Sequence, residues 1–181
     1  MQNLASGGVI AYPTEAVYGL GCDAFCESAV QRLLALKQRP WHKGLILVAA
    51  DLQQIAPLIA TLSEDQVGLL NASWPGPTTW VIPDPHHVIP HWVRGQHESV
   101  AVRISSHPIV KQLCEAWGAP LVSTSANLSG ETSIRSDLPL RKRQQRGQWT
   151  DLDFIVSGRC SGHKNPTVIR DLISGKVLRS S

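Results

Sequence analysis

The sequence predicts one α/β domain in which helices flank a β-sheet. A chain of 181 residues can bury one substantial hydrophobic core, so a single domain spanning residues 1–181 is expected. An apolar fraction of 43% and six tryptophans exclude a disordered chain. The apolar runs 9–12 and 45–49 lack the alternation of a half-exposed strand, which is typical of strands whose two faces are both covered.

A helix is expected between these two strands. Ser28, with Gln31 three residues later, has the spacing of a capping box. Val30, Leu33 and Leu34 then recur at helical spacing and predict the apolar face that packs on the sheet.

Two cations fall at the end of this helix. A proline disfavours helical geometry in the residue before it, so the helix must end before Pro40, with Lys37 and Arg39 at its end. One interpretation is that they complement the negative helix terminus, an effect of about 0.3–1 kcal/mol each. The other is that they line a pocket for phosphates or a carboxylate, with Trp41, His42 and Lys43 close behind. The loop expected over 13–21 is equally open, because Gly19 and Gly21 either form turns or let backbone approach a ligand closely.

The remaining elements are expected in a simple order. Residues 1–8 are too few to form a helix before the first strand. The later expectations are a helix over 51–62, kinked or split at Pro57; a helix capped by Ser63 and Gln66; a turn at 74–77; a strand over 78–82; a loop over 83–97; a strand over 100–104; a helix from Pro108 to Gly118; and strands over 121–123, 154–156, 167–172 and 176–179.

Composition narrows the class of protein. A net charge of +3 permits a polyanionic partner without requiring one. No apolar run reaches the roughly 18 residues that span a bilayer, and no signal peptide is recognisable. Four cysteines suit a reducing compartment, and Cys22 and Cys26 lack the second pair that a structural zinc site needs. A cytoplasmic protein without a metal held by its own side chains is therefore expected.

Polar residues mark two later strands. Residues 120–130, PLVSTSANLSG, run from a strand into a loop of hydroxyl and amide side chains. Residues 99–108, SVAVRISSHP, place Arg103 inside an apolar strand, where an unpaired charge would be costly. Together with YPTEAVYG at 12–19 and KQRP at 37–40, these motifs resemble the YrdC/TsaC family, the threonylcarbamoyl-AMP synthases. The resemblance extends from about Val9 to Arg179, with the motifs in the same order.

The resemblance implies a YrdC-like fold, with a twisted, mixed β-sheet flanked by helices and a cationic concave site. In the family, L-threonine, bicarbonate or CO2, and ATP give threonylcarbamoyl-AMP and pyrophosphate. Partner proteins then transfer the threonylcarbamoyl group to adenosine 37 of tRNAs that read ANN codons. Mg2+ is expected with the ATP, and a monomer is expected. The family usually carries an amphipathic helix before the first strand, for which residues 1–8 look too short.

The resemblance also assigns candidate site residues by motif. The residues expected to hold the triphosphate and act in catalysis are Lys37, Arg39, Ser125 and Asn127, with Ser133 and Arg179 as further ATP contacts. Those expected to bind threonine are Thr14, Arg103, Ser123 and Thr167. Apart from the resemblance, the serines and Asn127 are open to interpretation as turn residues that bond their own backbone. Arg103 needs an anionic partner, and the sequence identifies no structural one.

Two other functions remain open. A run of cations from Arg135 to Arg146, in which Arg141, Lys142 and Arg143 are adjacent, is either a solvated helix face or a contact for RNA phosphates. A non-catalytic module that binds tRNA or double-stranded RNA is therefore the alternative. The other possibility is a dinucleotide-dependent oxidoreductase, because residues 19–24, GLGCDA, fit a dinucleotide fingerprint. However, the following helix is expected too late to place its N-terminus on a pyrophosphate.

Overall fold

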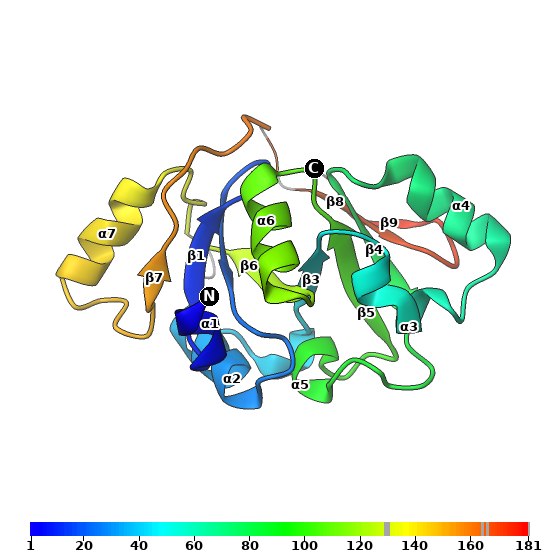
Figure 1. Cartoon of the computed structure of the whole chain (residues 1–181), viewed down its shortest axis with the longest axis horizontal. Coiled ribbons are helices and arrows are strands. Elements are labelled where there is room, and N and C mark those ends of the chain that lie inside the picture. Colours follow the sequence, from blue (N-terminus) through cyan, green and yellow to red (C-terminus); the bar gives the residue numbers. More distant parts are fainter. Residues whose placement is uncertain (129–130, 164, 166, 181) are drawn as a thin grey trace.

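The computed structural model describes residues 1–128, 131–163, 165 and 167–180 and contains one nine-stranded mixed sheet. Its strand order is β7-β1-β2-β6-β3-β5-β4-β8-β9, from β7 at the left of Figure 1 to β8 and β9 at the right. The pairs β1–β7, β3–β5 and β4–β8 are parallel and the other neighbours are antiparallel. The strands are β1 Ile10–Pro13, β2 Tyr18–Gly21, β3 Ile46–Ala49, β4 Thr78–Pro83, β5 Ser99–Ile104, β6 Leu121–Ser125, β7 Phe154–Ile155, β8 Val168–Asp171 and β9 Val177–Arg179.

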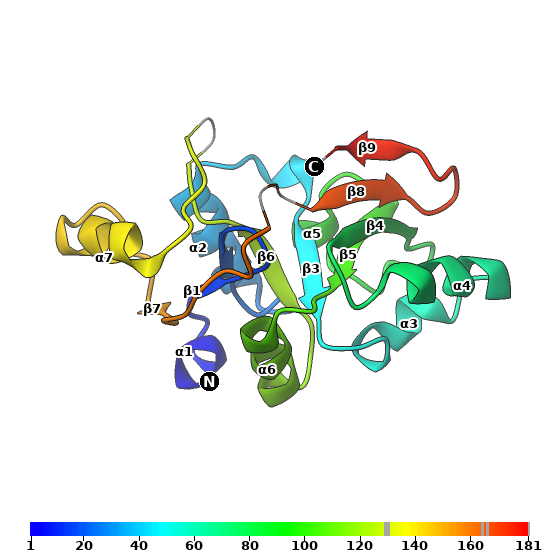
Figure 2. The same cartoon turned by 90° about the horizontal axis from the view of Figure 1, so that it is seen from above.

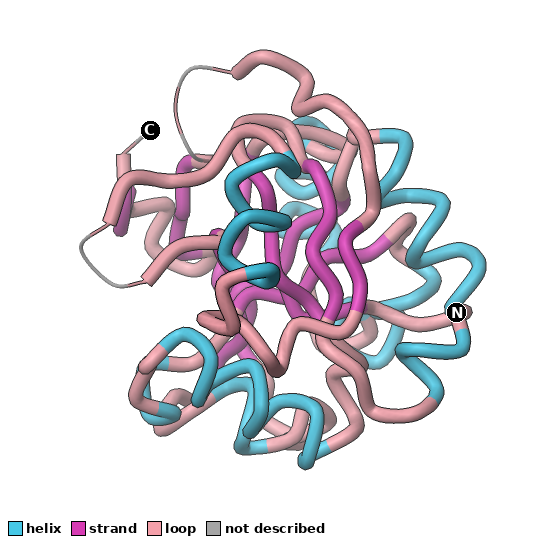
Figure 3. Tube along the Cα trace, turned by 90° about the vertical axis from the view of Figure 1, so that its left-hand side faces the viewer, coloured by secondary structure: helices cyan, strands magenta, loops and turns pink. Residues whose placement is uncertain are grey.

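Helices lie on both faces of this sheet (Figures 2 and 3). They are α1 Gln2–Ala5, α2 Glu27–Lys37, α3 Ala56–Ile59, α4 Glu64–Ser73, α5 His91–Arg94, α6 Pro108–Trp117 and α7 Asp137–Gln145, with short 3-10 turns at Trp41–Lys43 and Gln53–Ile55. None of the described helices is long and apolar enough to cross a lipid bilayer. The predicted α/β fold with a mixed sheet is confirmed.

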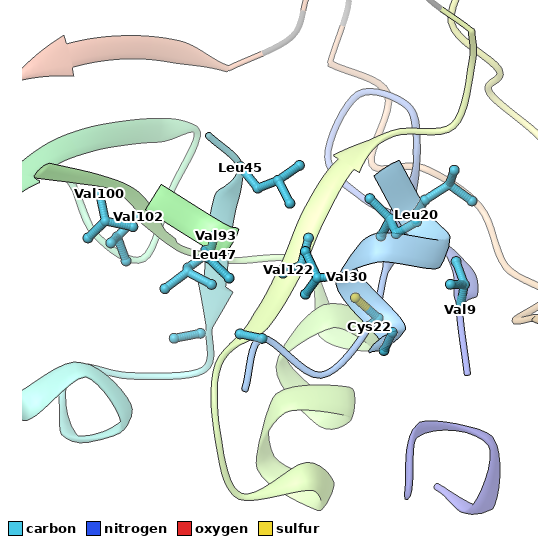
Figure 4. Close-up of a cluster of buried hydrophobic side chains, with 14 of the residues drawn as sticks. Val9, Leu20, Cys22, Val30, Leu45, Leu47, Val93, Val100, Val102 and Val122 are labelled. Carbon is cyan, nitrogen blue, oxygen red and sulfur yellow. The ribbon is translucent and has the colours of Figure 1, made fainter. Parts of the chain in front are cut away.

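The hydrophobic core has two parts, one on each face. On one face, Val110 and Cys114 of α6 pack with Val48 and Leu121 of the sheet. On the other face, α2 and α5 cover the larger cluster, in which Val30 and Val93 lie with Leu47, Val102 and Val122 (Figure 4). The central strands are therefore buried on both sides, which explains why their sequences do not alternate.

Several local predictions are confirmed. The Ser63 side chain accepts from the Gln66 backbone N–H while the Gln66 side chain accepts from the Ser63 N–H, so the capping box is present. Helix α6 begins at Pro108 and ends at Gly118, whose φ of 79° is the left-handed conformation that glycine adopts readily. The helix expected over 51–62 is split, with Pro57 in the first turn of α3.

Three local predictions are wrong. Helix α2 begins at Glu27 with Cys26 as its N-cap, so Ser28 lies inside the first turn and makes no capping bond. Residues 1–8 do contain a short helix, because Leu4 is buried in the core and packing stabilises a turn that would be unstable alone. The loop expected over 83–97 contains α5 for a similar reason, since Val93 is fully buried.

The most consequential difference is strand β2, which lies in the expected 13–21 loop. Residues 18–21 pair with β1 on one side and with β6 on the other. A Cβ on Gly21 would lie 2.3 Å from the Val122 carbonyl oxygen and 2.7 Å from Tyr12 Oη, so only glycine fits there. Gly21 thus allows close packing within the sheet, and both glycines lie in a strand and not in a turn. Gly19 lines the cavity described below, so a close approach of its backbone to a ligand stays a prediction. The dinucleotide fingerprint is not structurally realised.

Strand register places the polar residues on one face. Val48 of β3 is opposite both Arg103 of β5 and Leu121 of β6, so these side chains point to the same side. Two residues along β3, Ile46 is opposite Ala101 and Ser123. Helix α6 covers this face at one end of the strands. Ser123 and Arg103 therefore lie on the same face, beyond the part that α6 covers.

Candidate functional site

One cavity of about 730 Å3 lies over this face of the sheet. All the small-molecule site residues predicted from the sequence line it, although they come from seven different segments of the chain. They are Thr14, Lys37, Arg39, Arg103, Ser123, Ser125, Asn127, Ser133, Thr167 and Arg179. The four predicted cations therefore face a single hollow and not separate patches of solvent.

Lys37 is the most deeply buried cation of the α2 end of the cavity, with an exposed fraction of 4%. Its ammonium donates to the backbone carbonyl of Ser125 and, at 2.6 Å, to that of Asn127. These acceptors belong to β6 and the loop after it, so Lys37 does not serve to complement its own helix terminus. Burial and the charge of Arg39 lower the pKa of Lys37 to about 8.

The neighbouring groups at this end are held by the backbone. Arg39 donates from Nε and Nη2 to the Gly44 carbonyl, at 3.2 and 2.8 Å, and its burial lowers its pKa. Asn127 donates from Nδ2 to the carbonyls of Leu128 and Glu131, at 3.0 and 2.7 Å. The interpretation of Asn127 as a residue that bonds nearby backbone is thus correct, and it lines the cavity as well.

Arg103 and Thr167 form the opposite end of the cavity. Arg103 is 6% exposed and donates from Nη1 to Thr167 Oγ1 at 3.1 Å. Thr167 Oγ1 also lies 3.1 Å from Thr79 Oγ1, and Arg179 donates to the Thr167 carbonyl at 2.8 Å. Burial and the proximity of Arg103 lower the pKa of Arg179. Two cations therefore converge on one threonine in this part of the cavity.

The anionic partner of Arg103, which the sequence did not identify, is Glu15. Its Oε2 lies 3.5 Å from Arg103 Nη2, and its side chain is only 2% exposed. Burial alone would raise the pKa of Glu15, but the charge of Arg103 and a hydrogen bond from Ser105 outweigh it, so the pKa is lowered and the carboxylate is ionised. Glu15 lies in the YPTEAVYG motif, in the segment that the sequence predicted to be a loop. A carboxylate in a loop gave no reason to expect an ion pair with Arg103, which lies on a strand about ninety residues further along the chain.

Other lining residues were also missed by the sequence analysis. Arg94 and His97 line the cavity near Gly44, and Asp171 is the only acid among its described lining residues. Their sequence neighbourhoods are turns and a histidine-rich loop, which gave no pattern that distinguishes them from solvated surface. Lys43, which the pocket hypothesis placed close behind Lys37 and Arg39, lines the cavity as well.

The predicted RNA-binding residues lie outside this cavity, on α7 at the edge of the molecule (Figure 1). Arg141 forms an ion pair of 3.0 Å with Asp137 and also donates to Ser157. Arg143 pairs with Glu131 at 2.8 Å, and its guanidinium stacks 5.0 Å from the Trp149 ring. Two of the three cations thus have structural partners, and only the Lys142 side chain makes no ion pair or hydrogen bond with the described residues. RNA contact by this helix remains a prediction.

A magnesium ion fits the cavity only as a companion of a phosphate ligand. The described residues contain no group of three or more histidine, cysteine, aspartate or glutamate side chains that would hold a metal ion. Asp171 Oδ1 already accepts from the Ser174 backbone N–H and hydroxyl, at 2.7 and 2.6 Å. Mg2+ usually keeps several waters and binds substrate phosphates, so an ion here would be held by the phosphates of a bound ligand and not by the cations of the cavity wall.

The fold and cavity together define an α/β protein with a cation-lined pocket over its sheet, a lining suited to an anionic small molecule. A model of the Sua5/YciO/YrdC family, described as "Telomere recombination", matches residues 2–181, and the chain belongs to this family.

Two relatives are similar over almost their whole length. A threonylcarbamoyl-AMP synthase of Stenotrophomonas maltophilia is 52% identical over 182 residues, covering 99% of this chain and 95% of the relative. A threonylcarbamoyl-AMP synthase of Pseudomonas aeruginosa is 50% identical, covering 96% of this chain and 90% of the relative. Among solved structures, P. abyssi Sua5 complexed with L-threonine superposes with a TM-score of 0.82 at 32% identity over 94% of this chain. This chain spans about half of that Sua5 chain, namely 48%.

Proposed function

We propose that this protein is an L-threonylcarbamoyl-AMP synthase, which converts L-threonine, bicarbonate or CO2, and ATP to threonylcarbamoyl-AMP and pyrophosphate. The observation that carries the proposal is the convergence of Lys37, Arg39, Arg103 and Arg179 on one cavity. The similarity to synthases of nearly the same length supports the same conclusion.

Threonine is assigned to the Arg103 end. Its carboxylate would pair with the Arg103 guanidinium, which is planar and suited to bidentate contact with a carboxylate. Thr14, Ser123 and Thr167 place hydroxyl groups around the same space, where they would bond the substrate's polar atoms. Arg103 and Thr167 are both buried at this end.

ATP is assigned to the Lys37 end. Lys37 and Arg39 would contact the phosphates with charge-assisted hydrogen bonds, while Ser125, Asn127 and Ser133 add neutral ones. Arg179, which lies beside Thr167, would contact the nucleotide close to the threonine site. The two substrates would then lie end to end in the cavity, with the α-phosphate between the two groups of cations.

The reaction needs no nucleophile from the protein. The threonine amine first adds to CO2 and loses a proton, giving a carbamate. A carbamate oxygen then attacks the α-phosphorus, the bond from that phosphorus to the bridging oxygen of the β-phosphate breaks, and pyrophosphate leaves with the bond's electron pair. Lys37 and Arg39 would stabilise the charge that develops on the leaving group, so their contribution is electrostatic and positional. Mg2+, bound to the ATP phosphates, would supply further neutralisation of charge.

We also propose that the product is used in the threonylcarbamoylation of adenosine 37 in tRNAs that read ANN codons. That step would require tRNA and separate transferase proteins. We expect the enzyme to act in the cytoplasm, as a monomer. The alternative, a non-catalytic RNA-binding module, predicts no turnover at all.

The test is pyrophosphate release from ATP, bicarbonate and threonine. The purified protein should release pyrophosphate only when threonine is present. Lys37→Ala and Arg39→Ala should mainly lower kcat, because their contacts strengthen as charge develops. Lys111→Ala is a matched control, since Lys111 is an exposed cation of α6 that does not line the cavity. Threonine-independent release, or unchanged kinetics in both cavity variants, would contradict the proposal.

A further inference from the structure

A buried polar cluster lies behind the cavity wall, and the proposed chemistry does not use it. Glu15, Ser105 and His107 are 1%, 1% and 2% exposed. The Ser105 hydroxyl donates to Glu15 Oε1 at 2.6 Å and accepts from the His107 backbone N–H at 3.2 Å. None of these three residues lines the cavity, whereas Arg103, the ion-pair partner of Glu15, does.

The two oxygen atoms of the Glu15 carboxylate have different surroundings. Oε1 accepts a short hydrogen bond from Ser105, which fixes the orientation of the carboxylate. Oε2 lies 3.5 Å from Arg103 Nη2 and has no hydrogen bond among the described residues. The contact with Arg103 is therefore an ion pair that is longer than a hydrogen bond, so it attracts the guanidinium without occupying its N–H groups.

The guanidinium consequently retains donors. Among the described residues its hydrogen-bond acceptor is Thr167 Oγ1, reached from Nη1, and Nε has no partner. Arginine has five N–H donors in a fixed plane, so N–H groups of Nη1 and Nη2 remain for a ligand beside the bond to Thr167. Glu15 on one side and Thr167 on the other contact different Nη atoms and restrain the plane of the group.

We propose that Glu15 is a positioning residue for the carboxylate of the amino-acid substrate, and that it acts by holding the Arg103 guanidinium in the plane that receives this carboxylate. This inference rests on the proposed function, because it takes an amino acid as the ligand of Arg103. Ser105 extends the arrangement, since its hydroxyl orients Glu15.

Stability alone is a poor explanation for this pair. Two buried charges cost desolvation that their attraction repays only with good hydrogen-bond geometry, and an apolar pair of equal volume is often as stable. At 3.5 Å, with unpartnered atoms on both side chains, the Glu15–Arg103 geometry is not optimised for stability. Such a pair beside a ligand cavity is instead typical of a preorganised binding group.

The test compares binding of L-threonine and L-threoninamide, which lacks the carboxylate's charge, by calorimetric titration. Glu15→Gln keeps the size of the side chain and an acceptor for Ser105, but removes the charge. It should bind L-threonine about tenfold more weakly than the wild type, bind L-threoninamide almost unchanged, and keep the affinity for a non-hydrolysable ATP analogue within about twofold, because only the carboxylate contact depends on Arg103. Glu115→Gln is the matched control, since Glu115 is exposed on α6.

Ser105→Ala keeps both charges and provides a milder second variant. It should reduce the preference for threonine over the amide in the same direction, by a smaller factor, and it decides the question if Glu15→Gln does not fold. Unchanged threonine affinity, equal loss of both ligands, or a stronger preference for threonine in the variant would overturn the proposal. The proposed function is tested separately by threonine-dependent pyrophosphate release in the wild type.

Discussion

Lys37 should make the binding of ATP depend on pH. Its ammonium is buried, donates to the carbonyls of Ser125 and Asn127, and lies near Arg39. Burial and the like charge lower its pKa from 10.5 to about 8, so the side chain loses its proton in a range where an exposed lysine stays charged. Only the protonated form offers the phosphates a full positive charge.

The magnitude follows from the protonated fraction. With a pKa of about 8 this fraction is about 0.8 at pH 7.5 and about 0.03 at pH 9.5. If only the charged form binds ATP well, the apparent Kd rises by up to about 25-fold across this range, because it scales inversely with the competent fraction. Bound phosphates would raise the pKa again, so the inflection should be seen in the free protein and shifted upward in the complex.

The assay is calorimetric titration with a non-hydrolysable ATP analogue between pH 7.5 and 9.5, where the phosphates are already ionised. It omits threonine and CO2, whose own ionisation would complicate turnover. Lys37→Arg is the control, because an arginine stays charged throughout. A wild-type Kd that does not change, or an equal rise in Lys37→Arg, would refute the assignment of the pH dependence to Lys37.

The same burial has a consequence for stability. Between pH 8 and 10.5 the unfolded chain binds the proton that folded Lys37 has lost, so this residue makes stability rise with pH in that window. Below pH 8, holding the ammonium charged costs about 3 kcal/mol. Lys37→Met removes this cost but leaves two carbonyls without their donor, at about 1–3 kcal/mol each. The unfolding free energy should therefore change little while kcat falls about 100-fold or more.

Three further predictions concern other parts of the molecule. Arg103→Ala should raise the threonine KM about 100-fold with little change in the ATP KM, because a charge-assisted contact with the carboxylate is lost; steady-state kinetics with each substrate varied will measure this. Gly21→Ala should lower the unfolding free energy by about 2–3 kcal/mol, because the new Cβ meets the Val122 carbonyl, whereas Gly68→Ala in α4, where nothing lies within 4 Å, should raise it by about 0.5–1 kcal/mol; denaturant unfolding will distinguish them. In the third, alanine replaces all three adjacent cations of α7, which are Arg141, Lys142 and Arg143. This variant should keep adenylate synthesis but bind RNA more weakly, and the loss of RNA affinity should depend on the salt concentration.

Each of these has a result that would count against it. Equal effects of Arg103→Ala on both substrates would mean that the cavity has collapsed and that no separate threonine site exists. A neutral Gly21→Ala would show that β2 and β6 can separate without cost. If RNA affinity does not change in the triple variant, the three cations do not contact RNA. They would then be solvated surface residues, and Arg141 and Arg143 would serve only their intramolecular ion pairs.

The predictable part of the fold was local or periodic. The capping box at Ser63 and the proline and glycine that bound α6 depend on a few adjacent residues, and both were predicted correctly. Strand β2 was missed because Tyr18–Gly21 contains two glycines, which intrinsically disfavour strands. Its formation depends on two partners, β1 and β6, and β6 lies about a hundred residues further along the chain.

The residues of the candidate site likewise fall into those that the sequence suggested and those that it did not. Arg179 was assigned only through the family resemblance, whereas Lys37, Arg39 and Arg103 were identifiable from their surroundings in the chain, namely a helix end before a proline and an apolar strand. Glu15 was not, because a carboxylate in a loop is ordinary until its partner is known. Arg94 and His97 belong to a segment where no periodic pattern exists, so nothing local distinguished them from surface residues.

The sequence by itself determined which segments must be buried, since hydrophobic spacing is a local property, and its motifs suggested the candidate site residues. The tertiary structure decided how those residues are partnered. The Glu15–Arg103 ion pair, the bonds from Lys37 to the β6 carbonyls and the single cavity depend on strand order and register, which set distances between residues far apart in the chain. Those distances fix the charge and the pKa of each group, and no local pattern encodes them.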